Sequence, residues 1–209
     1  TPGQAASSYC TATSNGIFVH TANPPSVAVG DLVDVTGTVQ EFAGSTRINA
    51  TSVQITQTAQ ALPTAIVFNA ALPSSDPLAP SCFANADPKL ANFECFENMR
   101  ISLPNGFVNA PNQRLATDPL AEATISARTA RALQGVGLAY PGYAGIPSSI
   151  PIWFGNVHLF ELDVDRVGLP NRPMIGGETF NAVGVLGYES GDYELYPTAL
   201  NMTFVFKLP

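Results

Sequence analysis

The stretch that decides the fold is VGDLVDVTGTVQEFAGSTRINATSVQI, residues 29–55. Apolar and polar residues alternate along 32–39, which is the period of a half-buried β-strand. Ala43-Gly44-Ser45 predicts a hairpin turn, and a second strand follows from residue 46 to residue 55. Gly37 lies inside the first strand, where a bulge or bend helps a small barrel to close. The stretch therefore predicts a long curved hairpin from a small β-barrel.

The same hairpin recurs 147 residues further along the chain, without a gap. Three glycine pairs carry the match, namely Gly30 with Gly177, Gly37 with Gly184 and Gly44 with Gly191. Because each glycine serves a bend or a turn, three coinciding positions indicate a duplicated unit. We expect an all-β fold of two tandem OB-like barrels. Residues 1–60 form the first, 61–96 a loop-rich connector, and 97–209 the second.

The composition favours an extracellular protein that acts by binding. Only 12% of the 209 residues are charged, while 17 are glycine and 18 are proline, which suits strands joined by turns. The net charge is −7 with nine Lys and Arg, so no broad phosphate-binding surface is expected. No apolar run is long enough to span a bilayer, so membrane insertion is not expected. We predict an extracellular or cell-surface location and no enzymatic activity.

The three cysteines predict one disulfide. Cys82 and Cys95 lie close together in the segment PSCFANADPKLANFEC, residues 80–95. A bridge between them would close a loop and stabilise it by roughly 3 kcal/mol. The alternative is two buried thiols. Cys10 is left over, and no Cys or His spacing typical of a zinc site occurs.

Several segments carry a resemblance to a known family. They are GIFVHT (16–21), the stretch 29–55, FENMRISL (96–103), NGFVNAPNQR (105–114), GLAYPG (137–142), LFELDVDRVGLPN (159–171) and TFNAVGVLGYESGDYELYPTAL (179–200). In this order they resemble the OB-fold, non-catalytic region of bacterial extracellular nucleases of the endonuclease/exonuclease/phosphatase group. The resemblance implies a secreted accessory region without catalysis. The Ser-Asp-His signature of the catalytic domain does not occur in the chain.

The chain departs from that family at its start. The family has another strand before the segment equivalent to 16–21, and residues 1–15 match it poorly. Either that strand precedes residue 1 or the first barrel closes in another way. An edge left open in this way invites pairing with another chain.

Two kinds of binding site can be named from the sequence. For single-stranded or extracellular DNA, the candidates combine cations with rings on which bases stack. They are Arg47, Phe42, Arg100, Arg114, Tyr188 and Tyr193. The alternative is that the rings pack inside the barrels. For calcium, Asp163 and Asp165 are expected on one face of a strand, where oxygen ligands suit a hard cation. A solvated surface pair is the alternative.

Two functions follow from these observations. The first is a nucleic-acid-binding accessory module of a secreted nuclease. The second is a structural or interaction subunit of an extracellular or cell-surface assembly, such as a filament, in which strands pair between chains. The open edge and Cys10 favour the second, and it predicts self-association.

Overall fold

The fold was analysed in a computed structural model, which describes residues 14–69, 72, 93–127, 147 and 159–203. This part of the chain holds nine strands and one 3-10 turn but no α-helix, so the predicted all-β class is confirmed. The elements are β1 (Phe18–His20), β2 (Leu32–Phe42), β3 (Ser45–Gln57), β4 (Ile66–Val67), η1 (Glu94–Phe96), β5 (Arg100–Asn112), β6 (Ala123–Ser126), β7 (Leu159–Leu162), β8 (Thr179–Glu189) and β9 (Asp192–Thr203). In the described part, no helix could cross a membrane.

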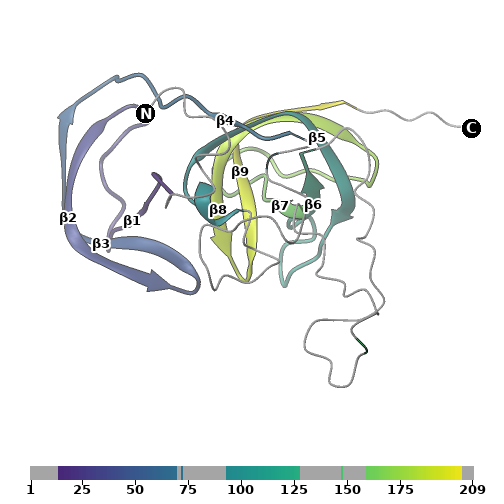
Figure 1. Cartoon of the computed structure of the whole chain (residues 1–209), viewed down its shortest axis with the longest axis horizontal. Helices are drawn as coiled ribbons and strands as arrows, with labels where there is room; N and C mark the ends of the chain where they lie inside the picture. Colours follow the sequence, from purple (N-terminus) through teal and green to yellow (C-terminus); the bar gives the residue numbers. More distant parts are fainter. Residues whose placement is uncertain (1–13, 70–71, 73–92, 128–146, 148–158, 204–209) are drawn as a thin grey trace, which may run out of the picture.

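Five strands close into a mixed barrel in the order β5-β6-β7-β9-β8, and β8 pairs back onto β5 (Figure 1). The β7–β9 pair is parallel and the other four pairs are antiparallel. Strand β4 extends the sheet by pairing parallel to β5. The prediction of a barrel in the C-terminal half is therefore confirmed.

The first barrel was predicted wrongly. Strands β1, β3 and β2 form a separate, open three-stranded sheet, which curves beside the barrel in Figure 1. The physical reason is the number of strands: three cannot curve far enough to meet their own outer edges, whereas the five of the barrel can. No residue from 14 to 65 is buried, so this sheet has no core of its own.

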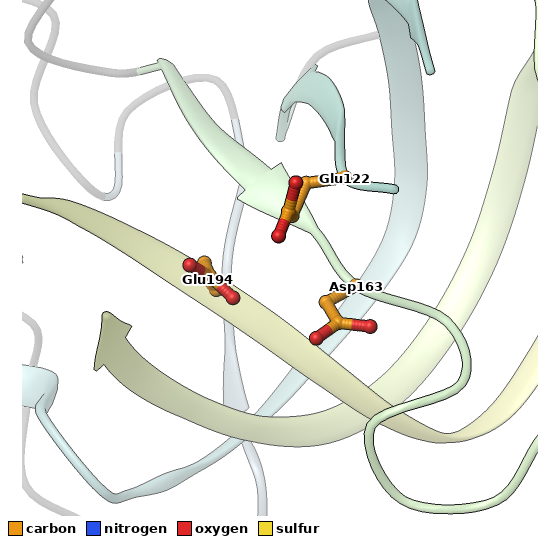
Figure 2. A group of neighbouring side chains, drawn as sticks. All are labelled: Glu122, Asp163 and Glu194. Atoms are coloured by element: carbon orange, nitrogen blue, oxygen red, sulfur yellow. The ribbon is translucent and has the colours of Figure 1, made fainter. Parts of the chain in front are cut away.

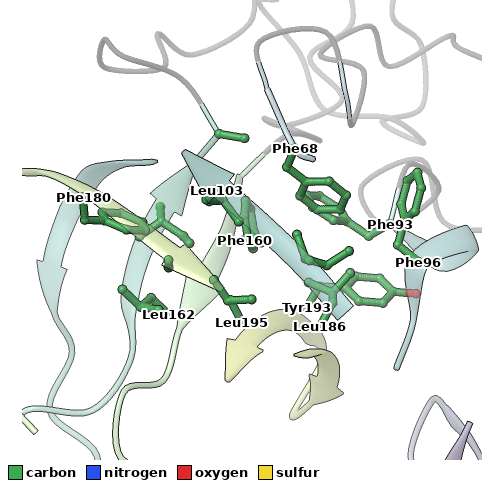
Figure 3. Close-up of a cluster of buried hydrophobic side chains, with 14 of the residues drawn as sticks. Phe68, Phe93, Phe96, Leu103, Phe160, Leu162, Phe180, Leu186, Tyr193 and Leu195 are labelled. Atoms are coloured by element: carbon green, nitrogen blue, oxygen red, sulfur yellow. The ribbon is translucent and has the colours of Figure 1, made fainter. Parts of the chain in front are cut away.

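The core lies inside the barrel and under the chain that leads into it (Figure 3). Leu103, Leu162, Leu186 and Leu195 are fully enclosed within the strands. At one end an aromatic cluster continues the core. Its members are Phe68, Phe93, Phe96, Phe160 and Tyr193, with ring centroids 5.1–6.2 Å apart in the contacting pairs. The described part of the predicted connector 61–96 is therefore part of the barrel unit, since it supplies β4 and three of these rings.

The two hairpins share their strand register at the predicted offset of 147 residues. Val39 pairs with Ile48 in the first hairpin, and Leu186 pairs with Leu195 at the positions 147 residues later. Both hairpins carry a register shift, between Thr36 and Gly37 and between Val183 and Gly184. The extra residue is a threonine in each case. Thr51 Oγ1 donates to the Thr36 carbonyl at 3.1 Å, and Thr198 Oγ1 donates to the Val183 carbonyl at 3.0 Å.

The glycines explain why the two hairpins bend alike. A Cβ on Gly37 would lie 2.3 Å from the Asn49 carbonyl oxygen, and one on Gly184 would lie 2.3 Å from that of Tyr196. Only glycine lets the two strands approach so closely at the bulge. At the turns, Gly44 and Gly191 have φ of 87° and 107°, which is glycine's region of conformational space.

Candidate functional site

The open sheet displays the face that forms the core in the barrel. Four apolar positions on β8 and β9 illustrate this, each only 0–4% exposed, namely Phe180, Ala182, Leu186 and Leu195. Their counterparts on β2 and β3, 147 residues earlier, are Val33, Val35, Val39 and Ile48. Val39 is 62% exposed, and the other three are only half-buried. The same apolar pattern is thus covered in one copy and uncovered in the other.

Strand pairing shows which strands cover the equivalent apolar face in the barrel. In the barrel, the outer edge of β8 pairs with β5, and the outer edge of β7 pairs with β6. Strand β1 takes the place of β7. Strand β1 pairs parallel to β3 at Arg47, and β7 pairs parallel to β9 at Glu194, which is the position 147 residues after Arg47. Among the described strands, nothing pairs with the outer edges of β1 and β2. Within the part of the chain that the structure describes, the open sheet therefore has no counterparts of β5 and β6.

The hydrogen-bonding groups of the free edge can be located in the same way. In the barrel, the Leu186 N–H donates to the Met99 carbonyl at 3.0 Å, and the Asn98 N–H donates to the Leu186 carbonyl at 2.6 Å. Leu186 thus directs both backbone groups away from β9 and toward β5. Val39 occupies the matching place on β2, so its N–H and C=O face the open edge. An unpaired row of this kind is a template for another strand.

Beside the sheet lies a hollow of about 450 Å³ between β3 and the loop that follows β1. Thr21, Pro25 and Val27 line it on the loop side, and Val53 and Ile55 on the strand side. None of its lining residues is titratable, so this hollow offers no acid–base chemistry.

Glu97 joins the open sheet to the barrel. Its side chain is buried, and Oε1 accepts hydrogen bonds from Ser45 Oγ at 2.6 Å and from the Thr46 N–H at 3.0 Å. Burial raises the pKa of the Glu97 carboxyl, while the bond from Ser45 opposes that shift. The Tyr188 ring packs against Gly44, where a Cβ would lie 2.3 Å from it. The tip of the first hairpin is thereby held against the barrel.

Three carboxylates meet at one end of the barrel (Figure 2). Glu122 lies just before β6, Asp163 just after β7, and Glu194 in β9. They meet because Ala123 pairs with Leu162, which brings Glu122 opposite Asp163, and because Leu162 pairs with Leu195, which brings Glu194 beside the end of β7. Each offers an oxygen, and these oxygens lie within 4.8 Å of one another. We call Glu122, Asp163 and Glu194 the carboxylate cluster.

The cluster perturbs the acidity of its members. Burial raises the pKa of Glu194 to about 8, and the charge of Glu122 adds to this shift. Burial also raises the pKa of Asp163 to about 6, and a hydrogen bond with Asp165 contributes. Perturbed carboxyls in one place are typical of functional sites, although structural networks produce them too.

The two aspartates predicted as a calcium pair, Asp163 and Asp165, lie in the chain that follows β7. Asp163 and Asp165 do not share a strand face, because β7 ends at Leu162 and both residues lie in the turn that follows. Asp163 belongs to the carboxylate cluster, and Asp165 accepts a hydrogen bond from Asn171 at 3.4 Å. Glu122 and Glu194 were not predicted, since their proximity depends on pairing between distant strands.

The six residues predicted for DNA do not form one surface. The Arg47 guanidinium lies 3.7 Å from the centre of the exposed Phe42 ring on the open sheet. Arg100 is on the barrel, where it donates to the Pro63 carbonyl, and Arg114 is exposed after β5. Tyr193 is buried and stacked on Phe93 at 5.5 Å, with Tyr188 against its edge at 5.0 Å. The Tyr193 ring therefore lies in the core, and the partly buried Tyr188 ring packs against it.

The cysteine prediction stays a prediction. Cys95 is buried in η1 at the barrel entrance, and Cys82 and Cys10 lie outside the described residues.

Comparison of the chain with protein-family models, curated proteins and solved structures finds no match. The resemblance to the non-catalytic region of extracellular nucleases therefore stays a prediction, and function is argued from the geometry alone.

Proposed function

We propose that this chain is a non-catalytic interaction module of an extracellular or cell-surface assembly, whose open sheet is completed by strands from a partner chain. The observation that supports this most is the register match between the open hairpin β2–β3 and the barrel hairpin β8–β9. An apolar face and an unpaired edge occur together in the copy that lacks two strands. Addition of strands to an exposed edge is an established mode of protein recognition.

The barrel supports an OB-like reading of both units. An OB-fold is a five-stranded Greek-key barrel, and the order β5-β6-β7-β9-β8 with a parallel β7–β9 pair is consistent with it. The open sheet β1-β3-β2 then corresponds to the last three strands of an OB barrel, which are β7, β9 and β8 in the closed barrel.

The matching strands in the barrel describe the partner that the open sheet would accept. Its first strand would run antiparallel to β2, as β5 runs antiparallel to β8. Alternate residues would be apolar, as Ile101 and Leu103 are on β5 and Ile125 is on β6. The partner is therefore a two-stranded apolar segment, and a second copy of this chain is one source to be tested.

The test compares two neighbouring lysine substitutions on β2. Val39→Lys places a charge on the apolar face, whereas Thr38→Lys places it on the opposite face of the strand. We expect wild type and Thr38→Lys to bind a peptide of residues 98–127, which carries β5 and β6, and Val39→Lys to lose at least tenfold in affinity. That loss corresponds to about 1.4 kcal/mol. Fluorescence anisotropy of the labelled peptide gives the affinities.

Sedimentation of the same three proteins over a range of concentrations tests the second copy. Self-association that Val39→Lys abolishes would identify the partner as another copy. A chain that stays monomeric and does not bind the peptide would refute the proposed function.

A second candidate is binding of single-stranded nucleic acid, favoured by the exposed pair of Arg47 and Phe42. The barrel offers little support, because the carboxylate cluster lies beside β6 and β7, strands 2 and 3 of an OB-like barrel, which form its usual binding face. We expect weak binding of oligo-dT at low salt, and loss of about tenfold in Phe42→Ala, since base stacking contributes roughly 1–3 kcal/mol. Binding that is unchanged in this variant would place any nucleic-acid site elsewhere.

A further inference from the structure

The carboxylate cluster is positioned by three adjacent strands and not by a single flexible loop. Glu194 lies in β9, where it pairs with Glu161 of β7, and Asp163 follows β7 with its N–H donating to the Leu195 carbonyl at 3.2 Å. Glu122 directly precedes the first residue of β6. Figure 2 shows each side chain directing an oxygen toward a common space. The backbone of the barrel therefore fixes the spacing of the three groups.

This spacing fits a bound hard cation. Calcium takes carboxylate oxygens at 2.3–2.6 Å, so two oxygens on the same ion lie up to about 5 Å apart. The three oxygens of the cluster lie within 4.8 Å of one another. Small movements of the side chains would bring all three into the coordination distance.

Glu194 gives an independent indication of a ligand. Its side chain is 2% exposed, and among the described residues no donor reaches Oε2. A buried, unpaired carboxylate oxygen is strongly unfavourable unless it is protonated or bound by a cation. One oxygen of the same side chain lies within 4.8 Å of oxygens of Glu122 and Asp163.

No basic side chain of the described residues offsets this charge directly. The guanidinium of Arg166, three residues after Asp163, pairs instead with Glu189 at 2.9 Å. The other groups acting on Glu194 are carboxylates, namely Glu122, Glu189, Glu161 and Asp163. Three carboxyl groups held close together, without a paired basic side chain among the described residues, favour a bound cation.

We propose that Glu122, Asp163 and Glu194 bind a calcium ion that ties β6, β7 and β9 together. The ligands are all carboxylate oxygens, which suit calcium and do not suit soft metals. Calcium accepts six to eight ligands in irregular geometry, so water completes the shell, whereas magnesium demands a nearly ideal octahedron.

The proposed ion would act at the weakest junction of the barrel. Strands β7 and β9 share only two register pairs, Glu161 with Glu194 and Leu162 with Leu195. The cluster lies at the end of this short parallel pairing. Calcium would therefore stabilise closure of the barrel, which is independent of whether the open sheet binds a partner.

The test uses the full chain stripped of metal with EDTA and then transferred to buffer. We expect calorimetric titration with calcium chloride to give one site with a Kd of roughly 10⁻⁴–10⁻³ M, the range of extracellular modules. Thermal unfolding in about 10 mM calcium should shift upward by several degrees, and magnesium should shift it less.

Two variants separate a calcium site from a merely buried acid. Glu194→Gln keeps the shape of the side chain, so it should fold at least as stably as wild type in EDTA while losing the calcium-dependent shift. Glu161→Gln removes a neighbouring charge outside the cluster, and its amide oxygen can still accept from Gln113 Nε2. This control should keep the shift.

Three outcomes decide the proposal. A calcium shift in wild type and Glu161→Gln that is absent from Glu194→Gln supports it. No heat and no shift in wild type at about 10 mM calcium would overturn it, because extracellular sites bind at or below that concentration. A shift that Glu194→Gln retains would also overturn it.

Discussion

Leu186→Ala should lower the free energy of unfolding by about 3 kcal/mol, whereas Val39→Ala should lower it by less than about 0.5 kcal/mol. The two residues hold the same position in the two hairpins. Leu186 pairs with Leu195, and Val39 pairs with Ile48. Leu186 is fully buried in the barrel core, so truncation removes contacts and leaves a cavity. Val39 is 62% exposed, so truncation removes little buried surface.

Urea denaturation of both variants measures the contrast. A second matched pair, Leu195→Ala and Ile48→Ala, repeats it with side chains of equal size, although Ile48 is half-buried and the difference should be smaller. If Val39→Ala proves as damaging as Leu186→Ala, the open face is covered in the isolated chain. The proposal of a partner would then lose its basis.

The hairpins could be predicted from the sequence because their determinants are local. Gly44 and Gly191 mark the turns, and Gly37 and Gly184 mark the bulges, so register follows from glycine spacing and strand alternation. Matched glycines give the bend of a strand, but they do not say how many other strands join it. The second barrel was therefore predicted correctly and the first was not.

Strand β5 shows how a local signal can mislead. Asn105-Gly106 is a typical turn sequence, yet it lies inside β5, where the register shifts between Leu103 and Gly106. Gly106 is needed there because a Cβ would lie 2.4 Å from the Phe180 ring. The glycine serves packing against a distant strand, which the neighbouring sequence does not reveal.

The carboxylate cluster was only partly predictable for a similar reason. Asp163 could be named because two aspartates lie close together in the sequence. Glu194 lies between Tyr193 and Leu195, which face the core, so alternation predicts an outward and solvated carboxylate. Its 2% exposure shows that burial depends on the tertiary structure around β9 and not on the strand pattern.

In EDTA, raising the pH from about 4.5 to 9 should destabilise the protein by roughly 4 kcal/mol through Glu194. Burial, with the charge of Glu122, raises the folded-state pKa of Glu194 from 4.5 to about 8. A raised pKa means that the folded state favours the protonated carboxyl. The resulting stability is complete below pH 4.5 and is lost as the pH rises through 8, because the unfolded chain has already released the proton.

Urea midpoints measured across this range should therefore fall in wild type and in Glu161→Gln, and should fall much less in Glu194→Gln. The amide stays neutral, so that variant lacks the main titrating group. A smaller decline that is complete just above pH 6 should remain in Glu194→Gln, because the pKa of Asp163 is raised from 3.8 to about 6 in the folded wild type. A flat profile in wild type would show that Glu194 ionises without cost in the folded state. Burial of Glu194 beside Glu122 and Asp163 would then not destabilise the barrel. A bound cation would in that case not act by relieving repulsion among these carboxylates.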